Sequence, residues 1–278
     1  MLQQRILTAL VLVALFLSGV LFVEPLVLAM IFAVVAAAGA WEWAPLAGWT
    51  GRAAQALFAL IQLGLIAALG WHCEVQGDMP RALVQPIVGA ACLFWSVATL
   101  LVESYPGSAR VWRSALVRSL MGWLILCATW LSVVYLMSLE NGSWLLVLLV
   151  LFVAVADVGA FFTGKSLGKH KLAPAVSPGK TWEGLWGGLL GGLLLTSLVW
   201  FNLPDDYAHL EWASLLVIGL ACTAASVIGD LTVSMVKRGS GVKDSGSLLP
   251  GHGGLLDRLD SICGAAPVFA LALMLVGY

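Results

Sequence analysis

Nine apolar segments, each close to the length that crosses a membrane as a helix, follow one another along the chain with short polar breaks between them. A helix needs about 20 apolar residues to span the hydrocarbon core of a bilayer. Of the 278 residues, 61% are hydrophobic and only 10% are charged, whereas soluble domains carry about 25% charged residues. We therefore expect an all-α polytopic membrane protein with spans near residues 6–23, 25–41, 53–70, 83–102, 118–138, 143–163, 184–203, 211–229 and 261–277.

The basic residues predict how these spans are oriented, because Lys and Arg gather in the cytoplasmic loops of membrane proteins. With a cytoplasmic N-terminus, nine spans place 13 of the 14 basic residues on the inner side and only Arg81 outside. We therefore expect the N-terminus to be cytoplasmic and the C-terminus to lie outside. The inner basic residues are Arg5, Arg52, Arg110, Arg113, Arg118, Lys165, Lys169, Lys171, Lys180, Lys237, Arg238, Lys243 and Arg258.

Net charge and cysteine spacing argue against two other classes of function. The formal net charge is −1, and duplex binding needs a strongly basic face, so nucleic acid is not an expected partner. The five cysteines lie singly along the chain. They lack the CxxC spacing of metal and redox sites, and we interpret them as packing residues.

Functional cues are concentrated in the second half of the chain. We expect one membrane domain over residues 1–278, in which residues 1–140 carry few cues and residues 143–278 supply the catalytic helices and inner loops. In the first part, Trp41-Glu42-Trp43 suits an interfacial aromatic belt around a solvated acid, or alternatively a support for the active site. In the second part, glycines spaced four apart near residues 184–192 allow close helix packing, within one chain or in a homodimer.

The most polar stretch, residues 226–261, contains four acids, four permanent cations, one histidine and seven glycines. The glycines allow several backbone N–H groups to point at one anion. Carboxylates from two helices can hold a hard cation such as Mg²⁺, which also bridges to phosphates. The stretch therefore predicts a phosphate-binding site, and the alternative is a solvated loop between two spans. Residues expected to share a helix face are Asp230, Ser234 and Lys237, and likewise Asp257 with Asp260.

A second polar region begins at Asp157, which interrupts an apolar segment. An ionisable group at membrane depth is costly and is a functional candidate by default, although it could also reach the interface. The loop that follows carries four lysines and a histidine against one acid, so it would attract phosphates. It is not a P-loop, because Pro174 stands where the GxxxxGK[ST] motif requires glycine. Ser177 or Thr181 could cap the next helix.

Both polar regions resemble the signature sequences of phosphatidate cytidylyltransferases, also called CDP-diacylglycerol synthases. The similarity covers residues 155–261 and implies an enzyme that converts CTP and phosphatidate into CDP-diacylglycerol and pyrophosphate. The matching motifs are Asp157-Val-Gly159-Ala-Phe161, Ser177-Pro178-Gly-Lys180-Thr181-Trp-Glu183-Gly184, Ser234-Met-Val-Lys237-Arg238, Lys243-Asp244-Ser-Gly246, Leu249-Pro250-Gly251-His252-Gly253-Gly254 and Leu255-Leu256-Asp257-Arg258-Leu259-Asp260-Ser261.

The resemblance also implies roles for the matching residues. Mg²⁺ would be held by Asp230 and Asp257, with Asp260 as a third ligand. The glycine backbone would cradle phosphate oxygens, and His252 would bind phosphate or orient a ligand. The predicted catalytic residues are Asp230, Asp257, Lys237, Arg238, Lys243, Asp244, His252, Arg258 and Asp260. The predicted substrate-binding residues are Asp157, Ser177, Lys180, Thr181, Ser234, Gly253 and Gly254.

Three alternatives stay open. A CTP-dependent lipid kinase would transfer the γ-phosphoryl group and release CDP. A cation or proton transporter would use Asp157, although the polar residues gather on one side instead of lining a path near the midplane. A catalytically dead scaffold would keep the same fold. For the enzyme we expect CTP, phosphatidate and membrane lipids as partners, a bacterial inner membrane as location, and an active site on the cytoplasmic face.

Overall fold

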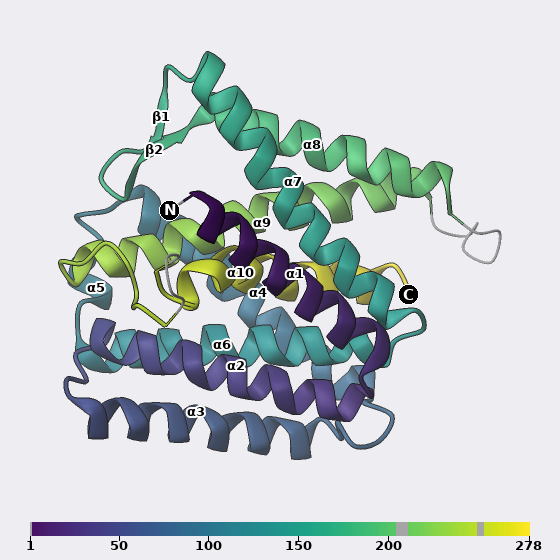
Figure 1. Ribbon diagram of the computed structural model, residues 1–278, viewed down its shortest axis with the longest axis horizontal. Helices are drawn as coiled ribbons and strands as arrows, with labels where there is room; N and C mark the ends of the chain where they lie inside the picture. Colours follow the sequence, from purple (N-terminus) through teal and green to yellow (C-terminus); the bar gives the residue numbers. More distant parts are fainter. Residues whose placement is uncertain (1, 204–210, 249–252) are drawn as a thin grey trace. The chain divides into compact units, whose positions relative to one another are not determined.

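The computed structural model describes residues 2–203, 211–248 and 253–278, almost entirely as helices (Figure 1). Each of the nine predicted apolar segments corresponds to a helix, so the expected all-α class is confirmed. One short helix and a two-stranded hairpin were not predicted. The elements are α1 (Leu2–Phe22), α2 (Pro25–Leu46), α3 (Arg52–His72), α4 (Arg81–Glu103), α5 (Ala109–Trp112), α6 (Ala115–Ser138), α7 (Gly142–Leu167), β1 (Lys171–Ala173), β2 (Ser177–Thr181), α8 (Trp182–Phe201), α9 (Trp212–Gly239) and α10 (Leu256–Leu275).

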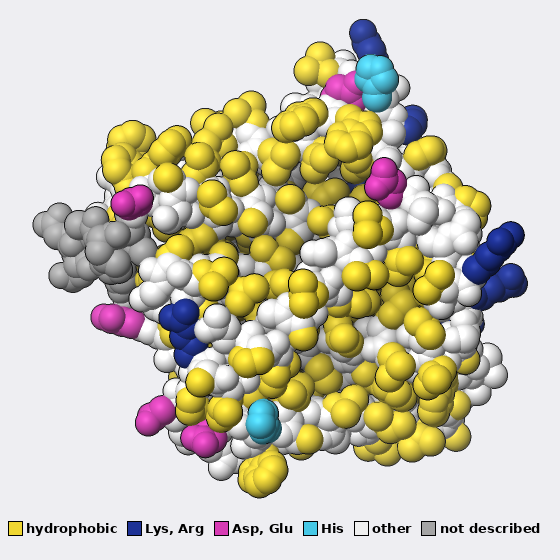
Figure 2. Space-filling view, turned by 180° about the vertical axis from the view of Figure 1, so that it is seen from behind, with side chains coloured by type: hydrophobic (Ala, Val, Ile, Leu, Met, Phe, Trp, Pro, Cys, Tyr) yellow, Lys and Arg dark blue, Asp and Glu magenta, His cyan; other side chains and the backbone are white. Residues whose placement is uncertain are grey.

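The helices have the length and the surface expected of membrane spans. Within the described residues, eight are long and apolar enough to cross a bilayer, and α1 contributes a shorter apolar stretch, Val13–Phe22. Figure 2 shows hydrophobic side chains over much of the face in view and few charged ones. Contiguous apolar surface of this kind is rare on soluble monomers and indicates apolar surroundings. The orientation of the two termini stays a prediction.

The chain forms two compact units, each built from three separate stretches. The first unit contains residues 1–84, 111–147 and 236–259, and the second contains residues 85–110, 148–235 and 260–278. Helices α4, α5, α7, α9 and α10 contribute residues to both units. The expected single membrane domain stays a prediction.

In the first unit, α2, α3 and α6 pack side by side (Figure 1). The buried indole of Trp43 donates to the Arg118 carbonyl oxygen at 2.8 Å, and Gly122 leaves room for this ring because a Cβ there would overlap it. The Arg118 guanidinium donates to the Leu46 carbonyl oxygen at 2.6 Å and to Ser240 Oγ at 3.0 Å. These bonds join the end of α2 and the start of α6 to Ser240, the residue that follows α9. The segment between α9 and α10, residues 240–255, is here called the polar loop.

In the second unit, glycines of α8 allow close contact with α7, as the small-residue ridge predicts. A Cβ added to Gly188 would lie 2.9 Å from the Ala156 carbonyl oxygen, and one added to Gly192 would overlap the Thr223 side chain of α9. These glycine contacts are therefore made within one chain. They lend no support to a homodimer, which stays a prediction.

We expect Gly159→Ala to lower the stability of the second unit by about 2 kcal/mol, the usual range for overpacking. A Cβ at Gly159 would lie 2.5 Å from the Gly187 carbonyl oxygen and 3.0 Å from its carbon, and backbone atoms cannot move aside easily. The matched control is Gly64→Ala in α3, where a Cβ would have no atom within 4 Å and alanine favours the helix. Thermal unfolding in detergent measures both, and equal melting temperatures would contradict the close α7–α8 contact.

Candidate active site

The predicted polar residues are organised into two clusters, one in each unit. Helix α9 contributes to both, because it carries Asp230 and Ser234 in its second-unit part and Lys237 in its first-unit part. The hairpin cluster, in the second unit, consists of Asp157, Lys180, Thr181, Asp230 and Ser234. The loop cluster, in the first unit, consists of Glu42, Lys237, Ser245, Gly254 and Asp257.

The β1–β2 hairpin fixes the position of Lys180. Its strands pair antiparallel between α7 and α8 (Figure 1). The buried Thr181 hydroxyl accepts a hydrogen bond from the Gly184 N–H at 3.1 Å, which caps α8 as predicted. Next to this cap, Glu183 pairs with His170 Nδ1 at 2.6 Å. Lys180 therefore stands on a strand that is fastened to the first turn of α8.

Lys180 and Asp230 form the ion pair of the hairpin cluster, with Nζ 2.7 Å from Oδ2. The other carboxylate oxygen of Asp230 accepts from Ser234 Oγ at 3.1 Å, so these two residues share a helix face as predicted. Asp157 and Lys180 line one cavity of about 190 Å³, and Asp157 lies within electrostatic range of both Lys180 and Asp230. The pair is 25% and 28% exposed, so an anion entering the cavity can reach the ammonium group.

Asp257, in the first turn of α10, holds the polar loop by its carboxylate. Lys237 Nζ lies 2.7 Å from Oδ1. The backbone N–H groups of Ser245 and Gly254 each donate to Oδ2 at 3.1 Å. The Lys237 and Asp257 side chains are only 9% and 12% exposed. Because this pair is largely withdrawn from water, removing one partner would leave a costly buried charge.

Glu42 of α2 is the second carboxylate of the loop cluster, and it is only 3% exposed. It accepts hydrogen bonds from Ser245 Oγ at 3.0 Å, from the Leu256 N–H at 2.9 Å and from the Leu248 N–H at 3.4 Å. At Leu256 it satisfies an N–H at the start of α10, where an anion is also favoured by the helix dipole. The predicted solvated acid is therefore wrong. These contacts show that Glu42 supports the loop, and the alternative, a support for the active site, stays a prediction.

Two glycines make the approach of the loop to Glu42 possible. A Cβ at Gly246 would lie 2.5 Å from Glu42 Oε1, and one at Gly254 would lie 2.6 Å from Oε2. Any larger residue would push the loop backbone away from the carboxylate. The Gly254 N–H is engaged by Asp257, and the expected phosphate cradle stays a prediction.

The other predicted residues belong to neither cluster. Arg238 donates to the Val242 carbonyl oxygen at 3.4 Å. Asp260 is buried and accepts from the Ser261 N–H at 2.9 Å. Ser177 begins β2 and is half-buried. Lys243, Asp244 and Arg258 are exposed, Gly253 has a φ of +85°, and His252 lies outside the described residues.

The carboxylates suit a hard cation, although they do not form a ready metal cage. Within the described ranges, no group of three or more Asp, Glu, His or Cys side chains converges on one point. Asp230 and Asp257 each hold a lysine where a cation would bind. Mg²⁺ commonly takes one or two carboxylates and completes its coordination with water and substrate phosphates. The donor set therefore fits only an ion that brings most of its ligands with it, and the expected Mg²⁺ stays a prediction.

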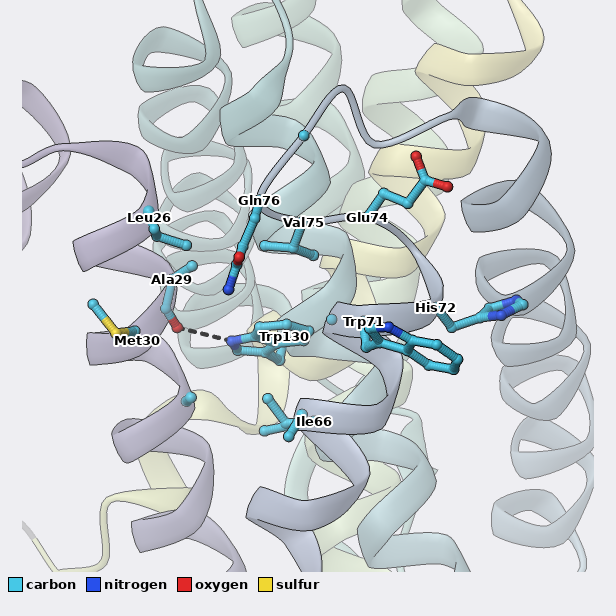
Figure 3. Close-up of a pocket in the computed structure, with 14 residues that line it drawn as sticks. Leu26, Ala29, Met30, Ile66, Trp71, His72, Glu74, Val75, Gln76 and Trp130 are labelled. Atoms are coloured by element: carbon cyan, nitrogen blue, oxygen red, sulfur yellow. Dashed lines mark hydrogen bonds between the residues drawn. The ribbon is translucent and has the colours of Figure 1, made fainter.

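A wider cavity of about 740 Å³ in the first unit contains no predicted site residue (Figure 3). It lies between α2, α3 and the segment after α3, beside the Trp130 indole, which donates to the Ala29 carbonyl oxygen at 2.9 Å. Figure 3 shows His72 pointing away from Trp130. This mostly apolar cavity offers no cation for a phosphate, and we do not include it in the candidate site.

Comparison with known proteins gives matches over nearly the whole chain. A family model described as "Cytidylyltransferase family" matches residues 3–276. A phosphatidate cytidylyltransferase of Pseudomonas aeruginosa is 42% identical over 279 residues, covering 100% of this chain and 99% of the relative. One from Haemophilus influenzae is 38% identical, covering 97% of this chain and 98% of the relative. One from Rickettsia bellii is 37% identical over 160 residues, covering 56% of this chain and 69% of the relative.

Proposed function

The chain belongs to the cytidylyltransferase family, and from this membership we propose that it transfers the cytidylyl group of CTP to phosphatidate, giving CDP-diacylglycerol and pyrophosphate. The observation that carries the proposal is the identity of 42% over the full length of a phosphatidate cytidylyltransferase. The membrane helices suit a lipid substrate. Neither the lipid kinase nor the transporter is favoured by these relatives.

The lipid substrate can act as nucleophile without a dedicated base. The second pKa of a phosphate monoester is about 6, so the group is largely ionised at neutral pH. One of its oxygens attacks the α-phosphorus of CTP, and the bond to the β-phosphate oxygen breaks to release pyrophosphate. The barrier is mainly electrostatic, because two anions must meet, and fixed cations supply the stabilisation.

We assign this task first to Lys180 and Lys237. Each is held by an aspartate at 2.7 Å, so each ammonium is fixed in position before substrate binds. In the more exposed Lys180–Asp230 pair, a phosphate oxygen would become an additional partner of Lys180. Arg238, Lys243 and Arg258 would neutralise the triphosphate and the departing pyrophosphate.

Mg²⁺ belongs to the proposal as the ion that accompanies CTP. Its candidate ligands are Asp230 and Asp260 in the second unit and Asp257 in the first. When bound, the ion would supply positive charge to the phosphates that carry the developing negative charge. The active site would lie on the cytoplasmic face of a bacterial inner membrane. CTP is available in the cytoplasm, and the loops predicted to lie on that side contain most of the basic residues.

Two isotopic labels test the proposed reaction on the purified full-length protein with phosphatidate and Mg²⁺. With [α-³²P]CTP we expect a labelled lipid, and with [γ-³²P]CTP we expect labelled pyrophosphate and an unlabelled lipid. A lipid labelled from the γ-position would instead identify a kinase. Absence of label transfer from either nucleotide would refute both enzymatic functions. The variant Asp230→Asn, assayed in the same way, is expected not to transfer the label of [α-³²P]CTP to the lipid.

A further inference from the structure

A second cavity of the second unit borders the small cavity of the hairpin cluster. Its volume is about 540 Å³, within the range of about 300–1,000 Å³ for ligand pockets, against about 190 Å³ for the small one. Leu172 of the hairpin, Leu185 of α8 and Val227 of α9 line both cavities. The two spaces therefore adjoin each other, one containing Asp157 and Lys180 and the other lying beyond a wall of apolar side chains.

The larger cavity, here called the acyl groove, is lined mainly by apolar side chains. Its walls come from the C-terminal end of α4, the hairpin, the start of α8 and the middle of α9. Val176 and Leu231 are buried against it, and Ile228 is half-buried. The Thr99 hydroxyl already donates to the Trp95 carbonyl oxygen at 2.9 Å and so needs no polar ligand. Glu103 also lines it, and this carboxylate would repel an anionic headgroup, which would lack a counter-charge there.

We propose that the acyl groove holds one acyl chain of the phosphatidate whose phosphate group binds at Lys180. This inference rests on the proposed function. A molecule with a charged head and an apolar tail matches a small cavity containing a lysine that adjoins a larger apolar one. CTP has no apolar tail, so the acyl groove belongs to the lipid substrate. Ile228 and Leu231, one turn apart on α9, would then limit the length or bulk of the chain that fits.

The substitution Ile228→Trp narrows the acyl groove and leaves every charged residue in place. Its effect on the preference between phosphatidates with long and short acyl chains tests the inference. We expect kcat/KM for dipalmitoyl phosphatidate to fall about tenfold relative to that for dioctanoyl phosphatidate, since pocket shape alone gives discrimination of this order. The KM for CTP should not change. The matched control is Val217→Trp, on the same helix but 66% exposed, and it should leave the ratio between the two lipids unchanged.

Two further measurements keep the inference falsifiable if Ile228→Trp is poorly folded. Leu231→Ala, which widens the acyl groove, should shift the ratio toward the longer lipid. A phosphatidate with a photoreactive diazirine at the end of one chain should label the hairpin or residues 224–231 of α9. Unlabelled phosphatidate should suppress this labelling, whereas phosphatidylcholine should not.

The outcomes separate this inference from the proposed function. If the wild type makes CDP-diacylglycerol but Ile228→Trp and Leu231→Ala affect both chain lengths equally, the acyl groove is not part of the lipid site. Labelling that phosphatidylcholine suppresses equally would mean that an ordinary membrane lipid occupies it, which also overturns the inference. If the wild type transfers no label from CTP, the proposed function fails, and specific photolabelling by phosphatidate still decides where the lipid binds.

Discussion

Asp257→Asn is expected to lower kcat/KM for CTP by at least about a hundredfold, comparable to the loss of a main electrostatic group in other enzymes. The Asp257 carboxylate holds the Lys237 ammonium and the N–H groups of Ser245 and Gly254. Asparagine offers one oxygen and one NH₂ group, so a donor would face either the ammonium or the backbone donors. Both the lysine and the loop would lose their position. Lipid labelling from [α-³²P]CTP measures the effect.

The same substitution should also reduce stability, by about 3 kcal/mol, because it leaves a buried ammonium group without its counter-charge. Stability is measured by thermal unfolding in detergent. Asp78→Asn is the control for the change in charge, since Asp78 is exposed and belongs to neither cluster. It should alter neither turnover nor melting temperature.

A double variant separates the catalytic role of this pair from its structural role. Lys237→Met combined with Asp257→Leu removes both charges, and apolar replacement of a buried ion pair is often neutral for stability. We therefore expect the melting temperature to recover in part, because the N–H groups of Ser245 and Gly254 still lack an acceptor, while activity stays lost. If activity recovered with stability, the pair would serve the fold alone and its assignment to the active site would be wrong.

The sequence predicted the helices well because each bilayer span has a strong local signal. Twenty apolar residues between polar breaks suffice to locate a span, and every predicted segment corresponds to a helix. The Thr181 cap could likewise be predicted, since it depends on a residue three positions away. The short β1–β2 hairpin was missed because three and five residues carry too little alternation to be distinguished from a basic loop.

The organisation of the site was harder to predict, because it depends on contacts between distant residues. Sequence spacing alone placed Asp230 and Ser234 on one helix face, which the structure bears out. It could not show that Lys180 pairs with Asp230, 50 positions later. It also favoured a solvated Glu42, because the acid stands between tryptophans at a helix end and its partners lie 203 to 214 residues away.

Glu42→Ala is expected to reduce kcat/KM for CTP about a hundredfold while the helices of the first unit stay folded. The substitution removes the acceptor of three donors, Ser245 Oγ and the N–H groups of Leu248 and Leu256. Each buried donor left without a partner costs about 1–3 kcal/mol, so the loop should move to reach water. Asp257 directly follows Leu256, and its carboxylate would move with the start of α10.

Hydrogen exchange and a graded series of variants test whether Glu42 acts by positioning the loop. In Glu42→Ala, amides of residues 245–248 and 253–257 should exchange faster, while those in the middle of α6 stay protected. Glu42→Gln keeps one acceptor oxygen and should lose only about tenfold in activity, since a single replaced hydrogen bond contributes about 1 kcal/mol. Glu24→Ala is the matched control, because Glu24 precedes α2, is exposed and makes no side-chain cap. Wild-type turnover and exchange in Glu42→Ala would show that the loop holds its catalytic position without the buried carboxylate.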